Sequence, residues 1–403
     1  MRVDSFQVMW RDLAKIGRDP DSGGYRRPGW SAAERECEAW FADQAGSRRL
    51  QVDRDGNGNV VAWWGAPTSG GVVTGSHLDS VPDGGAFDGP LGVVSGLAAV
   101  DRMRSDGVEP ERPIGVAVFA EEEGSRFGMP CLGSRLMTGA LDAKRAGKLR
   151  DPTGRALPDV MDDAGCAPDL GRSDLLHDPA VFVELHVEQG RGLVHADAAV
   201  GVASAIWPHG RWRMEFAGRA DHAGTTAMAD RYDPMLTFAM TALAANKQAR
   251  LADALATVGR VEVEPGGTNA IPSVVRAWLD ARAPEEEVLQ RLVAAIGKQA
   301  ADRAARDGTS FVLEPESVTA RVDFTVALRD QLVGLLGGAP VLATGAGHDA
   351  GVLASAGVPT AMLFVRNPTG ISHSPAEHAE PADCEAGVAA LATVLTALST
   401  NSG

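Results

Sequence analysis

The chain has 403 residues, more than one hydrophobic core usually holds, so its length predicts two domains. Hydrophobic residues make up 44% of it and charged residues 23%, which is typical of a globular protein rather than a fibrous or disordered one. The formal net charge of −15 argues against nucleic acid and anionic membranes as partners, because both repel an acidic protein.

The cysteines and the N-terminal segment predict a cytoplasmic protein. The four cysteines lie far apart and form no Cys-X-X-Cys pair, so we expect reduced thiols. The segment MRVDSFQVMWRDLAKIG lacks the apolar stretch of a signal peptide. No apolar run reaches the roughly 18 to 20 residues that a membrane span needs.

The first half of the chain alternates helices with apolar strands. Ser31 is a suitable N-cap for a helix through Ala42, and the turn residues DRDGNGN indicate a hairpin over 51–64. Continuous apolar runs of the kind found in buried parallel strands precede several polar loops. The further elements we expect are helices at 3–16 and from about Pro90 to Ser105, strands at 72–73, 114–120 and 180–190, and a helical polar segment over roughly 134–175.

The pattern changes after about Gly201. The elements expected here follow a β-α-β-β-α-β order. They are a strand with alternating residues at 211–217, a helix from about Asp233, two antiparallel strands within 259–284, a helix over about 285–307 and a strand at 310–316. The chain then returns to the first pattern, with a helix at 327–336, a strand at 360–365 and a last helix over about 381–398. We therefore expect an α/β fold in which a large catalytic domain with a central mixed sheet, residues 1–205 and 319–403, is interrupted by a small α+β ferredoxin-like domain, residues 206–318.

Potential metal ligands first appear in the stretch VVTGSHLDSVPDGGAFDGPLGVVSG, residues 72–96. His77 and Asp88 lie on loops beyond one strand, where open α/β sheets place their sites. Asp79 follows His77 by two residues, so both side chains point the same way in an extended chain, and Asp79 is suited to fix the tautomer of His77. A polar loop with ordinary turn aspartates would have the same composition.

Five potential ligands follow apolar strands in the larger domain: His77, Asp88, Glu123, His186 and His373. Five ligands with a carboxylate among them suit a two-metal centre in which an aspartate bridges ions roughly 3.5–4 Å apart. Glu122 is next to a ligand but is not needed as one, so it is the natural general base. Taken singly, a Glu run is usually a solvated face and a lone His an ordinary polar residue. Ligands of this kind accept Zn²⁺, Mn²⁺ or Co²⁺.

Seven motifs between residues 75 and 378 resemble, in order, the hydantoinase/carbamoylase branch of the aminoacylase and carboxypeptidase-type di-zinc amidohydrolases. They are GSHLDSVPDGGAFDG, AEEEGSRFG, ELHVEQG, GRADHAGTTAM, NAIPSVVRAWLDAR, GAGHDAG and NPTGISHSPAEH. The resemblance implies one ion held by His77, Asp88 and His186 and a second held by Asp88, Glu123 and His373. It also implies Glu122 as the general acid/base and the small domain as a lid that forms a homodimer.

The resemblance further assigns groups that bind the substrate. It implies that Asn269 and Arg282 hold a substrate carboxylate and that His222 reaches in from the partner subunit to stabilise the oxyanion. Gln189 and His348 would line the pocket. On the residues alone, Arg282 is as well explained as a strand arginine in an ion pair, His222 as a turn residue, and His348 as a loop residue that caps a helix.

The implied reaction is hydrolysis of a ureido group, R–NH–CO–NH₂, with release of ammonia and CO₂. We expect allantoate as the substrate, because SGGYRRPGWS and VRNPTGISHS resemble allantoate amidohydrolases. N-carbamoyl-L-amino acids and β-ureidopropionate are the alternatives within the branch. Dipeptides and N-acyl amino acids are disfavoured, since HVEQG and GAGHDAG belong to the ureido branch. From another class, a non-catalytic zinc-binding dimer is the alternative that the intact ligand set and Glu122 oppose.

Overall fold

A computed structural model describes residues 5–400, which form two compact units. Unit 1 comprises the chain up to Ala205 together with the chain from Asp323 onward, and unit 2 is the insert Ile206–Val322. The role of unit 2 as a lid remains a prediction.

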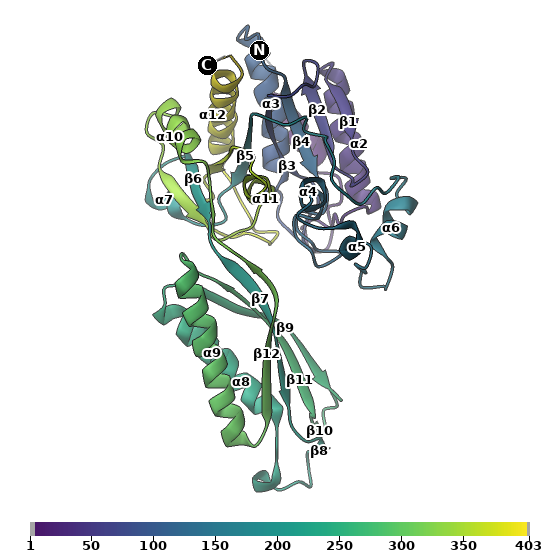
Figure 1. The fold of residues 1–403 in the computed structure, drawn as a ribbon, viewed down its shortest axis with the longest axis vertical. Helices are drawn as coiled ribbons and strands as arrows, with labels where there is room; N and C mark the ends of the chain where they lie inside the picture. Colours follow the sequence, from purple (N-terminus) through teal and green to yellow (C-terminus); the bar gives the residue numbers. More distant parts are fainter. Residues whose placement is uncertain (1–4, 401–403) are drawn as a thin grey trace. The chain divides into compact units, whose positions relative to one another are not determined.

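Unit 1 is built on a mixed sheet of nine strands in the order β1-β2-β4-β3-β5-β15-β6-β13, with β14 paired to β6 (Figure 1). The four strands β4, β3, β5 and β15 are parallel neighbours, and every residue in them is buried. This confirms the expected α/β fold with a mixed sheet. The strands are β1 (Gln51–Arg54), β2 (Val60–Trp64), β3 (Val72–His77), β4 (Ile114–Phe119), β5 (Val181–Val187), β6 (Val200–Ile206), β13 (Val322–Asp323), β14 (Val341–Thr344) and β15 (Thr360–Val365).

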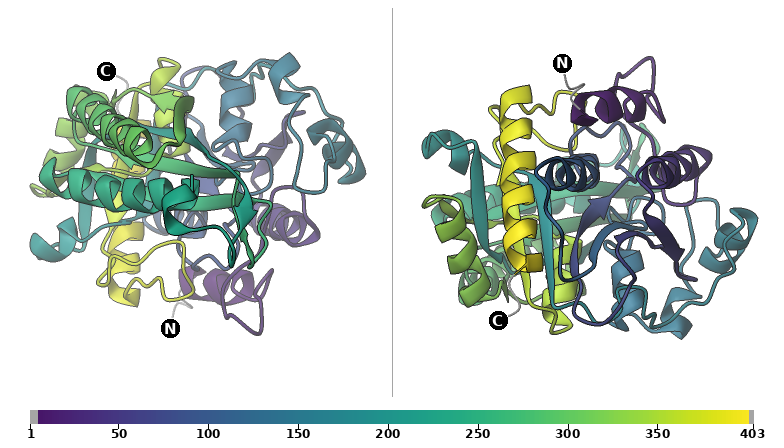
Figure 2. Two further views of the ribbon diagram at one scale, coloured as in Figure 1. Left: turned by 90° about the horizontal axis from the view of Figure 1, so that it is seen from below. Right: turned by 90° about the horizontal axis from the view of Figure 1, so that it is seen from above.

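Helices cover this sheet. α3 packs against β3, β4 and β5, and α12 packs against α3 (Figure 2, α12 in yellow). Among the described residues, α12 is the one helix long and apolar enough to cross a membrane, but it is mostly buried within unit 1, as a core helix is. The helices of unit 1 are α1 (Ser5–Leu13), α2 (Ala32–Ser47), α3 (Pro90–Ser105), α4 (Leu132–Thr138), α5 (Ala143–Ala146), α6 (Leu157–Asp163), α7 (Gly192–His195), α10 (Val326–Leu335), α11 (Asp349–Ser355) and α12 (Pro381–Thr400).

Two features of unit 1 differ from the sequence-based expectation. The helical segment expected over 134–175 is instead three short helices. The first ends at Gly139, whose φ of 78° stops the helix, and Gly154, with a φ of 86°, lies in the turn between the second and the third. The strand β6 was not expected, because Gly, Ala and Ser interrupt the three β-branched residues of its sequence VGVASAI and no polar alternation marks it. It becomes a strand by pairing with β15.

Unit 2 has the β-α-β-β-α-β order expected from its sequence. Its antiparallel sheet has the order β12-β7-β11-β9, and α8 and α9 lie side by side along it (Figure 1). Alternate residues of β7 and β11 are buried against these helices, and the residues between them form a polar face. Its elements are β7 (His209–Ala217), β8 (Asp221–His222), the 3-10 helix η1 (Met228–Asp230), α8 (Pro234–Leu251), β9 (Leu255–Glu264), β10 (Ala270–Ile271), β11 (Val274–Arg282), α9 (Glu286–Asp307) and β12 (Ser310–Thr319).

The close approach of α3 to the sheet gives a stability prediction. A Cβ at Gly92 would overlap the carbonyl oxygen of Leu185 and crowd Ser76. Although Ala is the better helix former, Gly92→Ala should lower the free energy of unfolding by about 1–3 kcal/mol, as overpacking does. Gly46→Ala in α2 is the matched control, because no atom lies near its added Cβ. Thermal unfolding of both variants checks this, and an unchanged melting temperature for Gly92→Ala would contradict the packing.

Candidate metal centre

The five expected ligands converge at one edge of the sheet in unit 1. His77 ends β3, Glu123 follows β4, His186 lies near the end of β5, and His373 follows β15. Because these strands are parallel, their carboxyl ends meet at the same edge, which is where open α/β sheets place their sites. Asp88 arrives there on the loop that leads into α3.

Asp88 is shared between two groups of ligand atoms. Its Oδ1 lies 3.2 Å from His186 Nε2 and 3.6 Å from His77 Nε2. Its Oδ2 lies 3.3 Å from His373 Nε2, which in turn lies 3.4 Å from Glu123 Oε2. In each of the groups His77–Asp88–His186 and Asp88–Glu123–His373, the potential ligand atoms lie within 4.8 Å of one another.

The donor atoms of these groups fit divalent cations. The Nδ1 atoms of His77 and His186 lie 3.1 Å and 2.9 Å from the backbone oxygens of Asp79 and Val187, so each Nδ1 carries the proton and donates it there. Both Nε2 atoms are buried and have no hydrogen-bond partner among the described residues, and each lies within 3.6 Å of Asp88 Oδ1. Zinc–ligand bonds of about 2.0–2.2 Å at tetrahedral angles separate ligand atoms by about 3.4 Å, which matches the spacings in both groups.

Electrostatics favour a cation at the same place. Burial alone would raise the pKa of Asp88, but the imidazoles of His186, His373 and His77 hold it well below its usual range. Burial, with the nearby Asp88 carboxylate, raises the pKa of Glu123 to about 7. Carboxylates this close together out of water repel each other unless positive charge lies between them.

Asp79 supports the centre in two ways. Its Oδ1 lies 3.4 Å from His77 Nδ1, near the contact that its backbone oxygen makes with the same nitrogen. Its two carboxylate oxygens accept hydrogen bonds from the backbone N–H groups of Glu122 and Glu123, each at 3.1 Å. Asp79 therefore connects the end of β3 to the tip of β4.

Glu122 lies beside the ligand atoms but outside both groups. It is buried, with Oε2 3.7 Å from His77 Nε2 and Oε1 accepting from the thiol of Cys131 at 3.3 Å. Burial raises the pKa of Glu122 well above its usual range, although His77 opposes the shift. A carboxyl group of this kind is suited to accept and return a proton.

A third group, Glu184, His186 and His348, also has ligand atoms near one another. Both oxygens of Glu184 already accept hydrogen bonds, from Ser76 Oγ at 2.8 Å and from the N–H of Ala350 at 2.9 Å. The His186 and His348 rings lie 4.5 Å apart between centroids. The group therefore fits a cation less well than the two that share Asp88.

The remaining predicted residues fall into two places. In unit 1, Gln189 donates to Asp88 Oδ2 at 2.8 Å, and His348 lies against His186. In unit 2, His222 and Asn269 lie together, because the N–H of Ala223 donates to the backbone oxygen of Asn269 at 2.9 Å and β8 pairs with β10.

Arg282 lies at the opposite end of unit 2 from His222 and Asn269. It ends β11, opposite His209 on β7, whereas the other two residues follow the Val274 end of the strand. Nine strand residues at about 3.3 Å each separate the two ends by roughly 26 Å. The Arg282 guanidinium binds Asp280 with two hydrogen bonds, of 2.8 and 3.1 Å.

Sequence reasoning missed two groups at the centre, Ser372 and Glu377. Ser372 Oγ lies 3.1 Å from Asp88 Oδ2 and 2.9 Å from Glu377 Oε1. One indication of their role was present in the sequence, since both residues lie in the motif SHSPAEH, which also contains His373.

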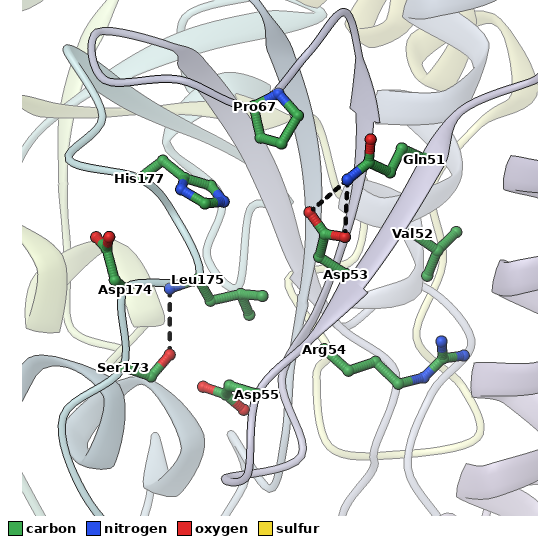
Figure 3. Close-up of a pocket in the computed structure, with 10 residues that line it drawn as sticks. All are labelled: Gln51, Val52, Asp53, Arg54, Asp55, Pro67, Ser173, Asp174, Leu175 and His177. Atoms are coloured by element: carbon green, nitrogen blue, oxygen red, sulfur yellow. Dashed lines mark hydrogen bonds between the residues drawn. The ribbon is translucent and has the colours of Figure 1, made fainter.

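A separate polar hollow of about 630 Å³ lies on unit 1, lined by β1 and residues 173–177 (Figure 3). Two of its acidic groups are engaged locally. The Gln51 amide donates to Asp53 (Figure 3), and the N–H groups of Asn57 and Asn59 donate to Asp55. None of the predicted site residues lines it.

Comparison with known proteins gives the family. Residues 73–397 match the peptidase family M20/M25/M40. The chain belongs to this family. It is 37% identical over 393 residues to an N-carbamoyl-L-amino acid amidohydrolase of Geobacillus stearothermophilus, covering 94% of each chain. It is 31% identical over 397 residues to an allantoate amidohydrolase of Bacillus subtilis, covering 95% of this chain and 94% of that one.

A solved structure gives the same relationship. The crystal structure of an amidase of the hydantoinase/carbamoylase family from Burkholderia vietnamiensis matches with a TM-score of 0.88 and 31% identity, covering 98% of this chain and 97% of that one. The resemblance drawn from the motifs is thus confirmed. M20 proteins are metal-dependent hydrolases of C–N bonds, and the two ligand groups of this chain fit that chemistry.

The sharing of Asp88 gives a prediction about metal affinity. Asp88 contacts all three imidazoles, whereas His373 belongs to one group. Asp88→Asn should therefore weaken zinc binding more than His373→Ala does, measured by competition with a chromogenic chelator. Equal losses, or a larger loss in His373→Ala, would show that Asp88 is not common to both groups.

Proposed function

We propose that the protein hydrolyses the ureido C–N bond of a small carboxylate-bearing compound at a centre of two divalent metal ions, with Zn²⁺ as the first choice and Mn²⁺ or Co²⁺ as alternatives. The observation that carries the proposal is the Asp88 carboxylate with one oxygen facing each ligand group, next to the buried Glu122. A bridging carboxylate between two such groups is the arrangement of two-metal hydrolases.

The chain's own residues account for the proton transfers. When bound, the ions would polarise the ureido carbonyl and make a water molecule more acidic. Glu122 accepts a proton from the water that attacks the ureido carbon and returns it to the nitrogen that leaves as the C–N bond breaks. The products are ammonia and the carbamate R–NH–COO⁻, which takes up a proton and loses CO₂ to leave the amine R–NH₂. His222 would stabilise the oxyanion formed in between.

The division of roles between Glu122 and Glu123 is open to a direct test. Glu122→Gln should keep metal but lose at least ~10²-fold in turnover, because a positioned acid–base group is removed. Glu123→Gln should instead lose metal, because its Oε2 lies beside His373. Metal content and kcat of both variants decide the assignment. If Glu122→Gln loses the metal and Glu123→Gln keeps it, the two roles are reversed.

Allantoate is the substrate expected from the loops SGGYRRPGWS and VRNPTGISHS. N-carbamoyl-L-amino acids are the second candidate, favoured by the 37% identity to the Geobacillus stearothermophilus enzyme, against 31% for the Bacillus subtilis allantoate amidohydrolase. Both candidates have a ureido group and a nearby carboxylate.

A substrate panel tests the function and separates the candidates. Metal-reconstituted protein is given allantoate, several N-carbamoyl-L-amino acids and β-ureidopropionate, and ammonia release is measured. We expect turnover of at least one ureido acid that is abolished in Glu122→Gln. Metal binding without turnover of any of them would favour the non-catalytic zinc-binding dimer.

Two features of unit 2 support a homodimer in which each chain completes the site of the other. Within one copy of unit 2, Arg282 lies too far from His222 and Asn269 for all three to contact one small substrate. If all three contact it, His222 and Asn269 would therefore come from a partner. In addition, α8 exposes three apolar residues at helical spacing, Leu236, Met240 and Leu243, which a second copy would cover.

Mixing two inactive variants tests the sharing. A His222→Ala chain is combined with a Glu122→Gln chain after reversible dissociation. In a hybrid dimer one site would keep both Glu122 and the partner's His222, so random pairing should restore roughly a quarter of wild-type activity, given a two-fold dimer. Hybrids confirmed by mass that show no recovery would exclude a shared site.

A further inference from the structure

The loops that carry Asp88 and His373 meet at one buried carboxylate, that of Glu377. Its Oε2 accepts hydrogen bonds from the backbone N–H groups of Phe87 and Asp88, at 2.8 and 3.0 Å. Its Oε1 lies 2.9 Å from the hydroxyl of Ser372, next to His373. Glu377 is 5% exposed and joins segments almost 290 residues apart in the chain.

The bonds to the Phe87 and Asp88 amides fix the main chain of a ligand. Asp88 lies in the short turn before α3, where Gly89 has a φ of 84° and the helix begins at Pro90. Without an acceptor, the two N–H groups would lose their hydrogen bonds in a largely buried place, which is costly. A single oxygen that accepts from successive residues holds the peptide between them in one orientation, and this orientation aims the Asp88 side chain.

The Ser372 hydroxyl continues the connection to the ligand side chain itself. It lies between Glu377 Oε1 and Asp88 Oδ2, at 2.9 and 3.1 Å. The Gln189 amide donates to Asp88 Oδ2 at 2.8 Å and to Ser372 Oγ at 3.2 Å. The Asp88 oxygen nearest His373 is therefore held by Gln189 and by Ser372, and Ser372 is in turn bonded to Glu377.

The turn before Asp88 is shaped around this carboxylate. A Cβ at Gly85 would overlap both Oε2 and Cβ of Glu377, so the main chain passes over Glu377 at a distance that only glycine permits. Gly85 has no positive φ angle, so it is the close approach that requires glycine here.

We propose that Glu377 is a positioning residue that fastens the Asp88 loop to the His373 loop and thereby sets the spacing of the shared carboxylate from the imidazoles. The proposal rests on the metal-binding part of the proposed function. Among the described residues, Glu377 makes no hydrogen bond or ion pair with a ligand imidazole or with Glu122, so its direct contacts reach the centre through the Asp88 loop and Ser372.

Zinc affinity, measured without substrate, tests the proposal. Metal-free wild type, Glu377→Ala and Glu377→Gln are titrated against a chromogenic chelator, with circular dichroism and thermal unfolding to confirm folding. Glu377→Ala should bind zinc 10- to 100-fold more weakly, as loss of a group that orients metal ligands usually does. Glu377→Gln keeps an acceptor oxygen and the side-chain shape, so it should recover part of the affinity.

Two further variants make the result specific. Glu380→Gln is the matched control, because Glu380 is on the same loop but its side chain is 56% exposed and pairs with His378, and it should bind zinc as wild type does. Gly85→Ala, which pushes the turn away from Glu377, should weaken zinc binding in the same direction as Glu377→Ala.

The outcomes separate this proposal from the proposed function. Wild type that binds no zinc contradicts the metal-dependent function itself. If wild type binds zinc and Glu377→Ala binds it with equal affinity, only the positioning role is overturned. This holds even when Glu377→Ala is less stable than wild type. If Glu377→Ala does not fold, Gly85→Ala and Glu377→Gln decide, and wild-type affinity in both overturns the proposal.

Discussion

The carboxylate of Asp88, buried among three imidazoles, is the contact on which the rest of the site depends. It lies within 3.2–3.6 Å of the Nε2 atoms of His186, His373 and His77. Imidazole nitrogens and carboxylate oxygens gathered in a buried place are the ligand atoms that a divalent cation such as Zn²⁺ takes. The parallel strands supply the required geometry, since each ends at the same edge of the sheet and delivers one ligand or the loop that bears it.

The sheet edge and the ligand set were accessible from sequence because they depend on local patterns. Strands buried on both faces are continuous apolar runs in the sequence. A His or Glu at the end of such a run is therefore expected at the carboxyl edge of the sheet. His77, Glu123 and His186 follow this rule. Asp88 and His373 lie on longer loops, and they were grouped with the others because they too follow strands of the same domain; the family motifs then divided the five ligands between two ions.

The parts that sequence did not predict depend on contacts between distant segments. Glu377 accepts hydrogen bonds from the amides of Phe87 and Asp88, which lie about 290 residues earlier in the chain. No local sequence pattern predicts such a bond. The strand β6 pairs with β15, and the first of the short helices over 132–163 ends at Gly139, whose positive φ angle the sequence alone does not give. Likewise, Asn269 and Arg282 are neighbours in one motif, but β11 holds them at opposite ends of unit 2.

Anomalous scattering at the zinc edge from crystals of the zinc-loaded protein tests most directly that Asp88 organises two cation sites. The account predicts two peaks in unit 1 of each chain, roughly 3.5–4 Å apart as in bridged metal pairs, one beside His77 and His186 and the other beside Glu123 and His373, with an oxygen of Asp88 touching each. A single peak, or a peak at Glu184, His186 and His348 that leaves Asp88 without a metal, would contradict it.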